Sequence, residues 1–360
     1  MTRSDYQKVF ILNSIGIGDL MFALPFLHTL RKNLPFSEII LAASKRQIPI
    51  AEQLLGKVVD GIQMRYYDNR LIDTAYWLLQ NSKINPDLFI EFSGGYRYAI
   101  TGRFSPAAKV LHPPDKYAKK LAQFFYEESV PKTKAHHRVD IYLSYIDNLG
   151  MQRNGTSFEF PVPASTEQQA AKLMEMHDMY GRRFIALVPQ SSEEWKSWPA
   201  QTLNETIDIL TRDMGQKVLI LGKDPNPNLH NKNVLDLGGK TNLLLDAYLA
   251  RYSGLIDISI GVDTGMMHIV GSVSSNPNGI YEGVSGNKTI SLFGATDPLM
   301  YGPYDPTGRF NLVVHPNLDE VKRDFLGYAV DKHRRDYMKE ITAKMILEKV
   351  EKHLGSKFHV

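Results

Sequence analysis

The chain has 360 residues, of which 43% are apolar and 22% charged, and its formal net charge is +3. These values are typical of a globular protein with room for two domains, and they exclude a disordered or fibrous chain. No cysteine is present, so disulfides, thiolate nucleophiles and cysteine-ligated zinc sites are excluded. The N-terminal stretch lacks the apolar core of a signal peptide, and no run reaches the roughly 18 apolar residues of a membrane span. We therefore expect a cytoplasmic protein.

The first half of the chain predicts alternating strands and helices. Strands are expected at 8–13, 38–43, 87–92 and 108–112, and helices at Asp19–Lys32 and Val139–Leu149. Residues 152–169 are rich in Gly, Pro, Ser and Thr, which interrupt the pattern. We place a linker at 161–178, so that an N-terminal domain spans 1–160.

After the linker the alternation restarts. Further strands are expected at 183–189, 217–222, 255–261 and 288–294, with helices between them. A C-terminal domain would span 179–335, and the apolar spacing of 336–360 predicts a closing helix. Two successive βα runs predict an α/β protein of two Rossmann-like, doubly wound domains. Ligands of such sheets bind beyond the carboxyl ends of the strands, so functional residues should follow strands.

A glycine turn follows the first predicted strand. Gly16 and Gly18 resemble the start of a dinucleotide fingerprint, but Met21 stands where a third glycine is required. Asp19, at the head of the next helix, would repel a phosphate. Asp19 either stabilises the helix dipole, by about 0.3–1 kcal/mol, or serves as a general base that accepts a proton from a sugar hydroxyl.

Two further clusters follow strands of the second domain. Ser191, Ser192 and Lys196 offer hydroxyl, backbone N–H and ammonium donors suited to a diphosphate, although a solvated loop lysine is the simpler explanation. Asp263, Thr264 and Gly265 form a strand-to-helix turn that could seat an anion.

Two single residues accompany these clusters. His268 lies on the first turn of the helix after Gly265, where it is either a packed histidine or a ligand contact. Asp224, just past a strand-ending glycine, could bind a ribose hydroxyl.

Other motifs fail on inspection. The stretch "GGKTN" at 238–242 mimics the end of a phosphate loop, but Val234 stands where that loop needs a glycine. No Asp-x-Asp pair occurs, and the adjacent His136 and His137 have no further ligand cluster. We therefore expect neither a metal nor a cofactor.

The order of these motifs is more specific than any one of them. Gly-x-Gly-Asp, Lys-x-Trp-Pro, Asp-Thr-Gly-x-x-His and "FGATDP" at 293–298 follow one another along the chain. In this the sequence resembles the bacterial heptosyltransferases of glycosyltransferase family 9, from about residue 8 to 354. The resemblance implies the GT-B architecture, with two domains facing a central cleft. It also implies inverting, metal-independent transfer of a heptose from a nucleotide-heptose, usually ADP-heptose, to the lipopolysaccharide core.

The resemblance also implies roles for particular residues. Asp19 matches the catalytic base, and the Gly16–Gly18 turn would face the acceptor. The donor would be bound by residues of the second domain, namely Ser191, Ser192, Lys196, Asp224, Asp263, Thr264, Gly265 and His268.

A basic segment lies in the first domain. Residues 97–138 carry nine Lys and Arg against Asp115, Glu127 and Glu128. We expect this segment to attract an anionic glycolipid or glycan acceptor, or the inner face of the membrane, rather than nucleic acid. The residues selected as acceptor contacts are Arg97, Arg103, Lys119, Lys120 and Arg138.

Three alternatives remain open at this stage: a GT-B-type nucleotide-sugar epimerase, a NAD-dependent oxidoreductase and a non-catalytic nucleotide-sugar binding protein. The missing third glycine weakens the second, and the presence of Asp19 and Lys196 argues against the third. The stretch 272–287 is longer than the usual turn of the family, and its Asn, Gly, Pro and Ser content predicts a surface loop. Such a loop is either inert or affects the choice of donor or acceptor.

Overall fold

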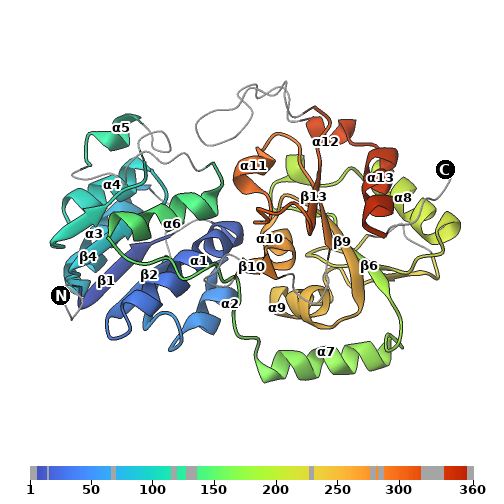
Figure 1. Ribbon diagram of the computed structural model, residues 1–360, viewed down its shortest axis with the longest axis horizontal. Coiled ribbons are helices and arrows are strands. Elements are labelled where there is room, and N and C mark those ends of the chain that lie inside the picture. The colour runs from blue at the N-terminus through green and yellow to red at the C-terminus, as the bar shows by residue number, and fades with distance from the viewer. Residues whose placement is uncertain are drawn as a thin grey trace. The chain divides into compact units, whose positions relative to one another are not determined.

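The computed structural model describes residues 6–13, 16–65, 70–114, 120–126, 136–226, 231–275, 281–282, 288–317 and 336–354. The chain divides into two compact units (Figure 1), which we call the N-terminal unit (Met1–Pro161 with Ser275–Ile280) and the C-terminal unit (Val162–Ser274 with Tyr281–Val360). Among the described helices, none combines the length and apolar character needed to cross a membrane.

The N-terminal unit contains a five-stranded parallel sheet with the order β3-β2-β1-β4-β5. The strands are β1 (Lys8–Leu12), β2 (Glu38–Ser44), β3 (Gly61–Arg65), β4 (Leu88–Glu91) and β5 (Lys109–Leu111). All but β3 were predicted from their apolar runs. The sequence of β3, GIQMR, has no such run, because residues 61–64 of this edge strand are only half-buried.

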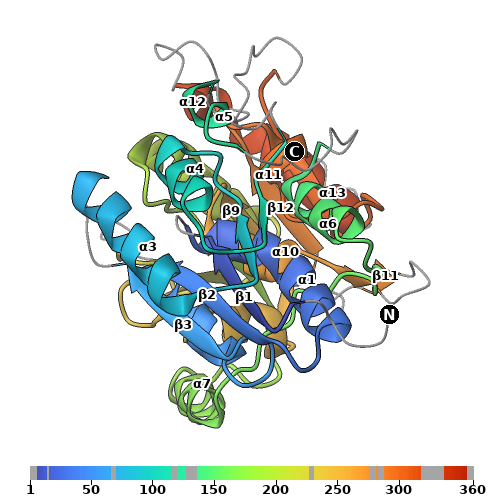
Figure 2. The same cartoon turned by 90° about the vertical axis from the view of Figure 1, so that its left-hand side faces the viewer.

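Helices cover both faces of this sheet (Figure 2). On one face lie α1 (Ile17–Asn33) and α6 (Arg138–Asn148), and on the other lie α3 (Arg70–Ile84) and α4 (Tyr96–Arg103). Shorter helices are α2 (Ile48–Ala51), a 3₁₀ turn η1 (Glu52–Leu54) and α5 (Lys120–Gln123). Alternate strand residues such as Phe10 and Phe89 pack with Trp77 of α3 and Tyr98 of α4, as the two-residue period of a strand requires.

The C-terminal unit contains a six-stranded parallel sheet with the order β13-β12-β9-β6-β7-β8. The strands are β6 (Phe184–Val188), β7 (Val218–Ile220), β8 (Val234–Asp236), β9 (Ile256–Val262), β12 (Lys288–Leu292) and β13 (Asn311–Val314). The edge strands β8 and β13 were not predicted. Both are short and mostly half-buried, and β8 (VLD) has two apolar residues, whereas β13 (NLVV) has a short apolar run that was overlooked.

Helices again lie on both faces of the sheet (Figure 1). On one side are α8 (Ala200–Asp208), which continues into the π-helical turn η4 (Ile209–Asp213), and α13 (Ala343–Leu354). On the other side are α9 (Leu243–Ala247), its π-helical extension η5 (Tyr248–Tyr252) and α10 (Gly265–Gly271), with α7 (Ala164–Met176) packed against α9. The remaining short helices are η3 (Glu194–Lys196), α11 (Pro298–Tyr301) and α12 (Tyr337–Glu340). The prediction of two doubly wound α/β domains is confirmed.

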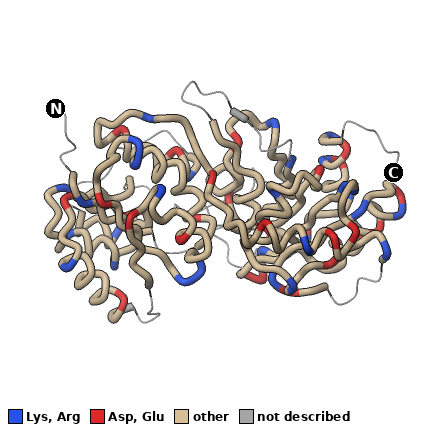
Figure 3. The backbone as a smooth tube through the Cα atoms, turned by 90° about the horizontal axis from the view of Figure 1, so that it is seen from below, with Lys and Arg blue, Asp and Glu red and all other residues tan. Residues whose placement is uncertain are grey.

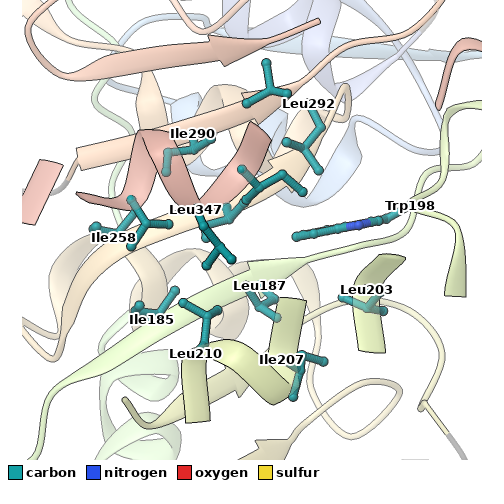
Figure 4. Packing of buried hydrophobic residues seen from close by; sticks show 14 of the residues in the cluster. Ile185, Leu187, Trp198, Leu203, Ile207, Leu210, Ile258, Ile290, Leu292 and Leu347 are labelled. Carbon is teal, nitrogen blue, oxygen red and sulfur yellow. The ribbon is translucent and has the colours of Figure 1, made fainter. Parts of the chain in front are cut away.

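The core on the α8 and α13 side is built from branched side chains of the central strands (Figure 4). Ile185, Leu187, Ile258, Ile290 and Leu292 contact apolar residues of the two helices, and all five are completely buried. On the opposite side, α10 approaches the sheet closely at Gly261, where an added Cβ would lie 2.5 Å from the sulfur of Met267. A glycine is therefore required at this position of β9.

Two expected segments differ from the structure. Residues 164–176, which were assigned to the linker, form helix α7, whose buried residues Thr166, Ala170 and Met174 recur at helical spacing. The closing helix is broken into α12 and α13, because Ile341 is extended and the Thr342 hydroxyl accepts a hydrogen bond from the backbone N–H of Met345 (3.3 Å), which caps α13. Residues 355–360 lie outside the described part of the chain.

Of the long segment 272–287 the structure describes only 272–275 and 281–282, which contain β10 (Ser274–Ser275) and β11 (Tyr281–Glu282). Residues 276–280 and 283–287 lie outside the described residues, so its expectation as a surface loop stays a prediction. Ser275 forms an antiparallel bridge with Thr156 through backbone hydrogen bonds of 2.9 and 3.2 Å. This bridge fixes one end of the segment to the N-terminal unit.

Asp246 of α9 is a buried carboxyl, and its Oδ1 accepts a hydrogen bond from the Thr241 hydroxyl at 2.5 Å. Burial raises the pKa of Asp246 to about 6, although the Thr241 hydrogen bond opposes this shift. The folded protein therefore retains this proton at pH values where the unfolded chain has lost it, so stability should fall between about pH 4 and pH 6.

Asp246→Asn keeps the oxygen that accepts the Thr241 hydrogen bond but cannot ionise. The unfolding free energy of this variant should rise relative to that of the original chain as the pH is raised. From pH 4 to pH 7 the difference between the two should grow by roughly 3 kcal/mol in favour of the variant. Urea denaturation at the two pH values measures this gain. An equal difference at both would mean that Asp246 ionises normally.

Candidate active site

Each sheet has one point at which the strand order reverses. In the N-terminal unit it lies between β1 and β4, and in the C-terminal unit between β6 and β9. Such switch points open a crevice at the carboxyl edge of a parallel sheet, where ligands bind. Asp19 follows β1, Lys196 follows β6 and Asp263 follows β9. The residues selected from the sequence thus lie at both switch points.

In the N-terminal unit, Asp19 closes the glycine turn. Its Oδ2 accepts a hydrogen bond from the backbone N–H of Gly16 at 2.9 Å, and Gly16 is the residue that precedes α1. An added Cβ at Gly16 would lie 3.1 Å from this same oxygen, so a larger residue would crowd the carboxylate. Asp19 therefore caps α1, a structural role that was not predicted beside its effect on the helix dipole. Capping uses one N–H, whereas a carboxylate can accept about four hydrogen bonds, so it leaves the Asp19 carboxylate able to accept a proton as well.

Gln47 forms hydrogen bonds that fix the same turn, and it was not predicted as a site residue from the sequence. Its side chain is completely buried after β2, where Oε1 accepts from the Ser44 N–H (2.9 Å) and Nε2 donates to the Gly16 carbonyl (2.7 Å). The Gly16 peptide is thus fixed through both its N–H and its carbonyl. A glutamine in a turn gives no sequence signal for such a role.

Glu91, at the end of β4, organises the other side of this switch point. Its Oε2 accepts from the backbone N–H groups of Ser93 (2.9 Å) and Gly94 (3.1 Å), while its carbonyl accepts from the Tyr145 hydroxyl at 2.9 Å. His112 lies 3.4 Å from Oε1, and both side chains are fully buried. Burial raises the pKa of Tyr145 well above its usual value, and the nearby Glu91 carboxylate adds to this. The cluster fixes the turn that starts α4.

The basic residues selected as acceptor contacts lie in different environments. Arg97 donates to Asp73 at 2.7 Å, and the Asp73 side chain is fully buried. Arg138, the first residue of α6, is buried. Arg103 and Lys120 are exposed, and Lys119 lies outside the described residues. Their role in acceptor binding stays a prediction.

In the C-terminal unit, a buried ion pair spans the switch point. The Lys196 ammonium lies 2.6 Å from Oδ2 of Asp263, and the two side chains are 14% and 8% exposed. Thr296, which is buried beyond β12, donates its hydroxyl to the same Oδ2 at 2.7 Å. His268 of α10 lies 3.7 Å from Oδ1. Lysine, threonine and histidine therefore converge on one carboxylate from three separate segments.

This convergence keeps Asp263 ionised. Burial alone would raise its pKa, but the Lys196 ammonium and His268 outweigh burial and hold the pKa of Asp263 well below its usual range. The pair is electrically neutral as a unit, which lowers the cost of burying it. An ammonium with three N–H donors can bind Asp263 and still donate to a phosphate.

Thr296 was missed as a site residue, because "FGATDP" served only as a family marker. Its place could have been inferred, since it follows the predicted strand next to the one that precedes Asp263. Asp297, the next residue, caps α11 by accepting from the Leu299 N–H at 2.9 Å.

The remaining donor-site predictions fall around the same edge of the sheet. The Ser191 hydroxyl lies 3.5 Å from the Asp263 carbonyl, and its N–H donates to the Ser197 hydroxyl at 3.1 Å. Ser192 is exposed. Thr264 precedes α10 and Gly265 begins it, with the Thr264 carbonyl accepting from the Met267 N–H at 3.0 Å.

Asp224 lies in the loop that follows β7. Gln190 fixes this loop with two hydrogen bonds of 2.8 Å to the backbone N–H and carbonyl of Asp224. These bonds use only the backbone of Asp224. Among the described residues, no group of three or more His, Cys, Asp or Glu that could hold a metal ion occurs.

We expect the Lys196–Asp263 pair to behave as a coupled unit in stability measurements. Lys196→Ala should lower the free energy of unfolding by about 3 kcal/mol or more, because it leaves a buried carboxylate without its cation. Thr296→Val should cost less, about 1–2 kcal/mol, since it removes one donor. Adding Asp263→Asn to Lys196→Ala should restore part of the loss, and strictly additive effects in urea denaturation would contradict the coupling.

The chain is similar to known proteins of one family. The model of the family described as glycosyltransferase family 9 (heptosyltransferase) matches residues 87–325. Lipopolysaccharide heptosyltransferase 3 of Escherichia coli is 25% identical over 303 residues, which cover 80% of this chain and 83% of that protein.

Solved structures share the fold of this chain. A glycosyl transferase of family 9 from Veillonella parvula matches with a TM-score of 0.75 at 18% identity, over 99% of both chains. The E. coli heptosyltransferase WaaC, solved with ADP, matches with a TM-score of 0.63 at 16% identity, over 96% of this chain and 99% of that one. The GT-B fold expected from the motifs is thus confirmed. Since the family model covers more than half of the sequence, the chain belongs to glycosyltransferase family 9 and is a glycosyltransferase.

Proposed function

We propose that this glycosyltransferase moves a heptose from a nucleotide-heptose, with ADP as the nucleotide, to a lipopolysaccharide core or a related anionic glycan. The reaction inverts the anomeric centre, needs no metal and takes place at the inner face of the cytoplasmic membrane. The observation that carries the proposal is the Lys196–Asp263 pair at 2.6 Å, at the switch point of the C-terminal unit. Relatives named as lipopolysaccharide heptosyltransferases support the sugar and the acceptor class.

The donor half of the reaction falls to the C-terminal unit. The C1–O bond to the diphosphate breaks as the acceptor oxygen attacks C1, so negative charge collects on the leaving ADP. Lys196 is already oriented by Asp263, and its ammonium stabilises this charge without having to be ordered during the reaction. Thr296 acts through Asp263, because its hydroxyl fixes the oxygen that Lys196 binds.

The acceptor half falls to the N-terminal unit. Asp19 takes the proton of the attacking hydroxyl as the new C1–O bond forms. The Gly16 N–H and the buried Gln47 hold the turn from which Asp19 projects, so the carboxylate is positioned before the acceptor arrives. A fixed base is consistent with transfer to a hydroxyl, and family membership favours transfer over epimerisation of the donor.

The first test separates the base from the helix cap. Asp19→Asn keeps an oxygen that accepts the Gly16 N–H but cannot take up a proton. Turnover should fall by about 100-fold or more, the scale of general-base loss, while ADP affinity and thermal stability remain near those of the original chain. Asp19→Ala should lower both turnover and stability. Nearly normal turnover in Asp19→Asn would leave Asp19 with the capping role alone.

The second test concerns the diphosphate. Lys196→Ala should weaken ADP binding by roughly 1.5–3 kcal/mol, as expected for a charged hydrogen-bond donor. The exposed Lys240 of the same unit is the matched control, and Lys240→Ala should leave the affinity unchanged. Calorimetry at a temperature where both variants are folded measures the affinities. Turnover that survives EDTA completes the expected pattern, whereas unchanged ADP affinity in Lys196→Ala or strong inhibition by EDTA would refute the assignment.

A further inference from the structure

Helices α3, α4 and α5 of the N-terminal unit pack against one another in this order, and we call the three together the outer layer. Asn81 of α3 donates to the carbonyl of Thr101 in α4 at 3.1 Å, and the Ser105 hydroxyl just beyond α4 donates to Oδ1 of Asn81 at 3.3 Å. Helix α5 contacts α4 in turn. Figure 2 shows α3 and α4 on the side of the sheet away from α1 and α6.

Exposed apolar side chains are concentrated on this layer. The described residues include eleven large hydrophobic side chains that are exposed, and six of them lie on or directly beside these three helices. They are Leu71 (82% exposed), Ile72 (49%), Leu79 (53%), Phe104 (68%), Leu121 (60%) and Phe124 (84%). Such a concentration on a small part of the chain marks an interaction surface.

Helix α3 is apolar on two sides. Trp77 faces the core and is fully buried, while Leu71, Ala75 and Leu79 recur every four residues along the exposed side. A surface helix of a globular protein normally presents a polar outer face. The outer face of α3 therefore has the composition of a surface that is covered in use.

The charge of the outer layer has one sign. Lys83, Arg103 and Lys120 are exposed, and Figure 3 shows where basic and acidic residues lie along the chain. Among the described residues of the three helices the one acid is Asp73, which is fully buried and paired with Arg97. A surface that combines apolar side chains with exposed cations fits an anionic lipid bilayer. It fits a second copy of itself less well, because like charges would meet.

We propose that the outer layer docks on the surface of an anionic lipid bilayer, with Leu71, Leu79 and Phe124 entering the headgroup region and Arg103 and Lys120 contacting lipid phosphates. The inference rests on the proposed function in one respect, because an acceptor carried by the membrane would require the enzyme to reach the membrane surface. Its test needs no turnover, so it can succeed or fail independently of the sugar transfer.

The experiment is sedimentation of the full chain with vesicles of phosphatidylcholine, alone or with part of it replaced by phosphatidylglycerol. We expect binding to the anionic vesicles that weakens as salt is raised. Arg103→Gln with Lys120→Gln should weaken it about fivefold for each charge removed, from about 1 kcal/mol per basic residue. Leu71→Ser with Leu79→Ser should weaken it about tenfold or more and leave the salt dependence in place.

Two controls replace strongly exposed apolar residues that lie outside the outer layer. The controls are Phe36→Ser and Met176→Ser. Phe36 lies just before β2 and is 96% exposed, and Met176 lies at the end of α7 and is 77% exposed. Both should bind vesicles like the original chain, and unchanged ADP affinity shows that all variants are folded. Equal binding to neutral and anionic vesicles, or no loss in the outer-layer variants, would overturn the proposal. So would self-association that the Leu71 and Leu79 changes abolish, because the face would then pair with a second copy. Vesicle binding without heptose transfer would instead refute the proposed function and leave the docking surface standing.

Discussion

One buried carboxylate organises the functional edge of the C-terminal unit. Asp263 receives Lys196 from the loop after β6, Thr296 from the loop after β12 and His268 from α10. Burying a charge is costly unless the charge is paired and hydrogen-bonded. The Asp263 carboxylate can therefore be buried only because these three groups interact with it. In return, Asp263 determines where the Lys196 ammonium stands. The segments around the edge are thus fixed to one another through a single side chain, before any substrate arrives.

The N-terminal unit solves a similar problem with backbone groups. Asp19 is held by the N–H of Gly16, and the carbonyl of Gly16 is held by Gln47. The two units thus hold these carboxylates with different groups. Lys196 and His268 keep Asp263 ionised, whereas the backbone N–H of Gly16 donates to Asp19.

Much of this arrangement follows from the sequence. The central strands β1 and β6 are apolar runs that are buried on both faces, and β9 (IDISIGV) has apolar residues at alternate positions. The carboxyl ends of these strands, and with them Asp19, Lys196 and Asp263, could therefore be located. The edge strands β3 (GIQMR) and β8 (VLD) are half-buried and lack such a run, whereas the short apolar run of β13 (NLVV) was overlooked. The pairing of Lys196 with Asp263 could not be derived from spacing, because 67 residues separate them and only the strand order brings β6 beside β9. Gln47 and the pairing of Arg97 with the buried Asp73 could not be predicted either, since nothing in a local pattern tells a buried polar residue from an exposed one.

The bridge between Thr156 and Ser275 has a consequence for how the chain is made. The two residues are 119 positions apart, and most of the C-terminal unit lies between them in the sequence. Domains generally fold as they leave the ribosome, N-terminal parts first. The N-terminal unit can collapse early, but its last backbone hydrogen bonds must wait until residue 275 has been synthesised. A fragment that ends at Pro161 would lack this bridge. The complete N-terminal unit therefore requires two separate stretches of chain, Met1–Pro161 and Ser275–Ile280.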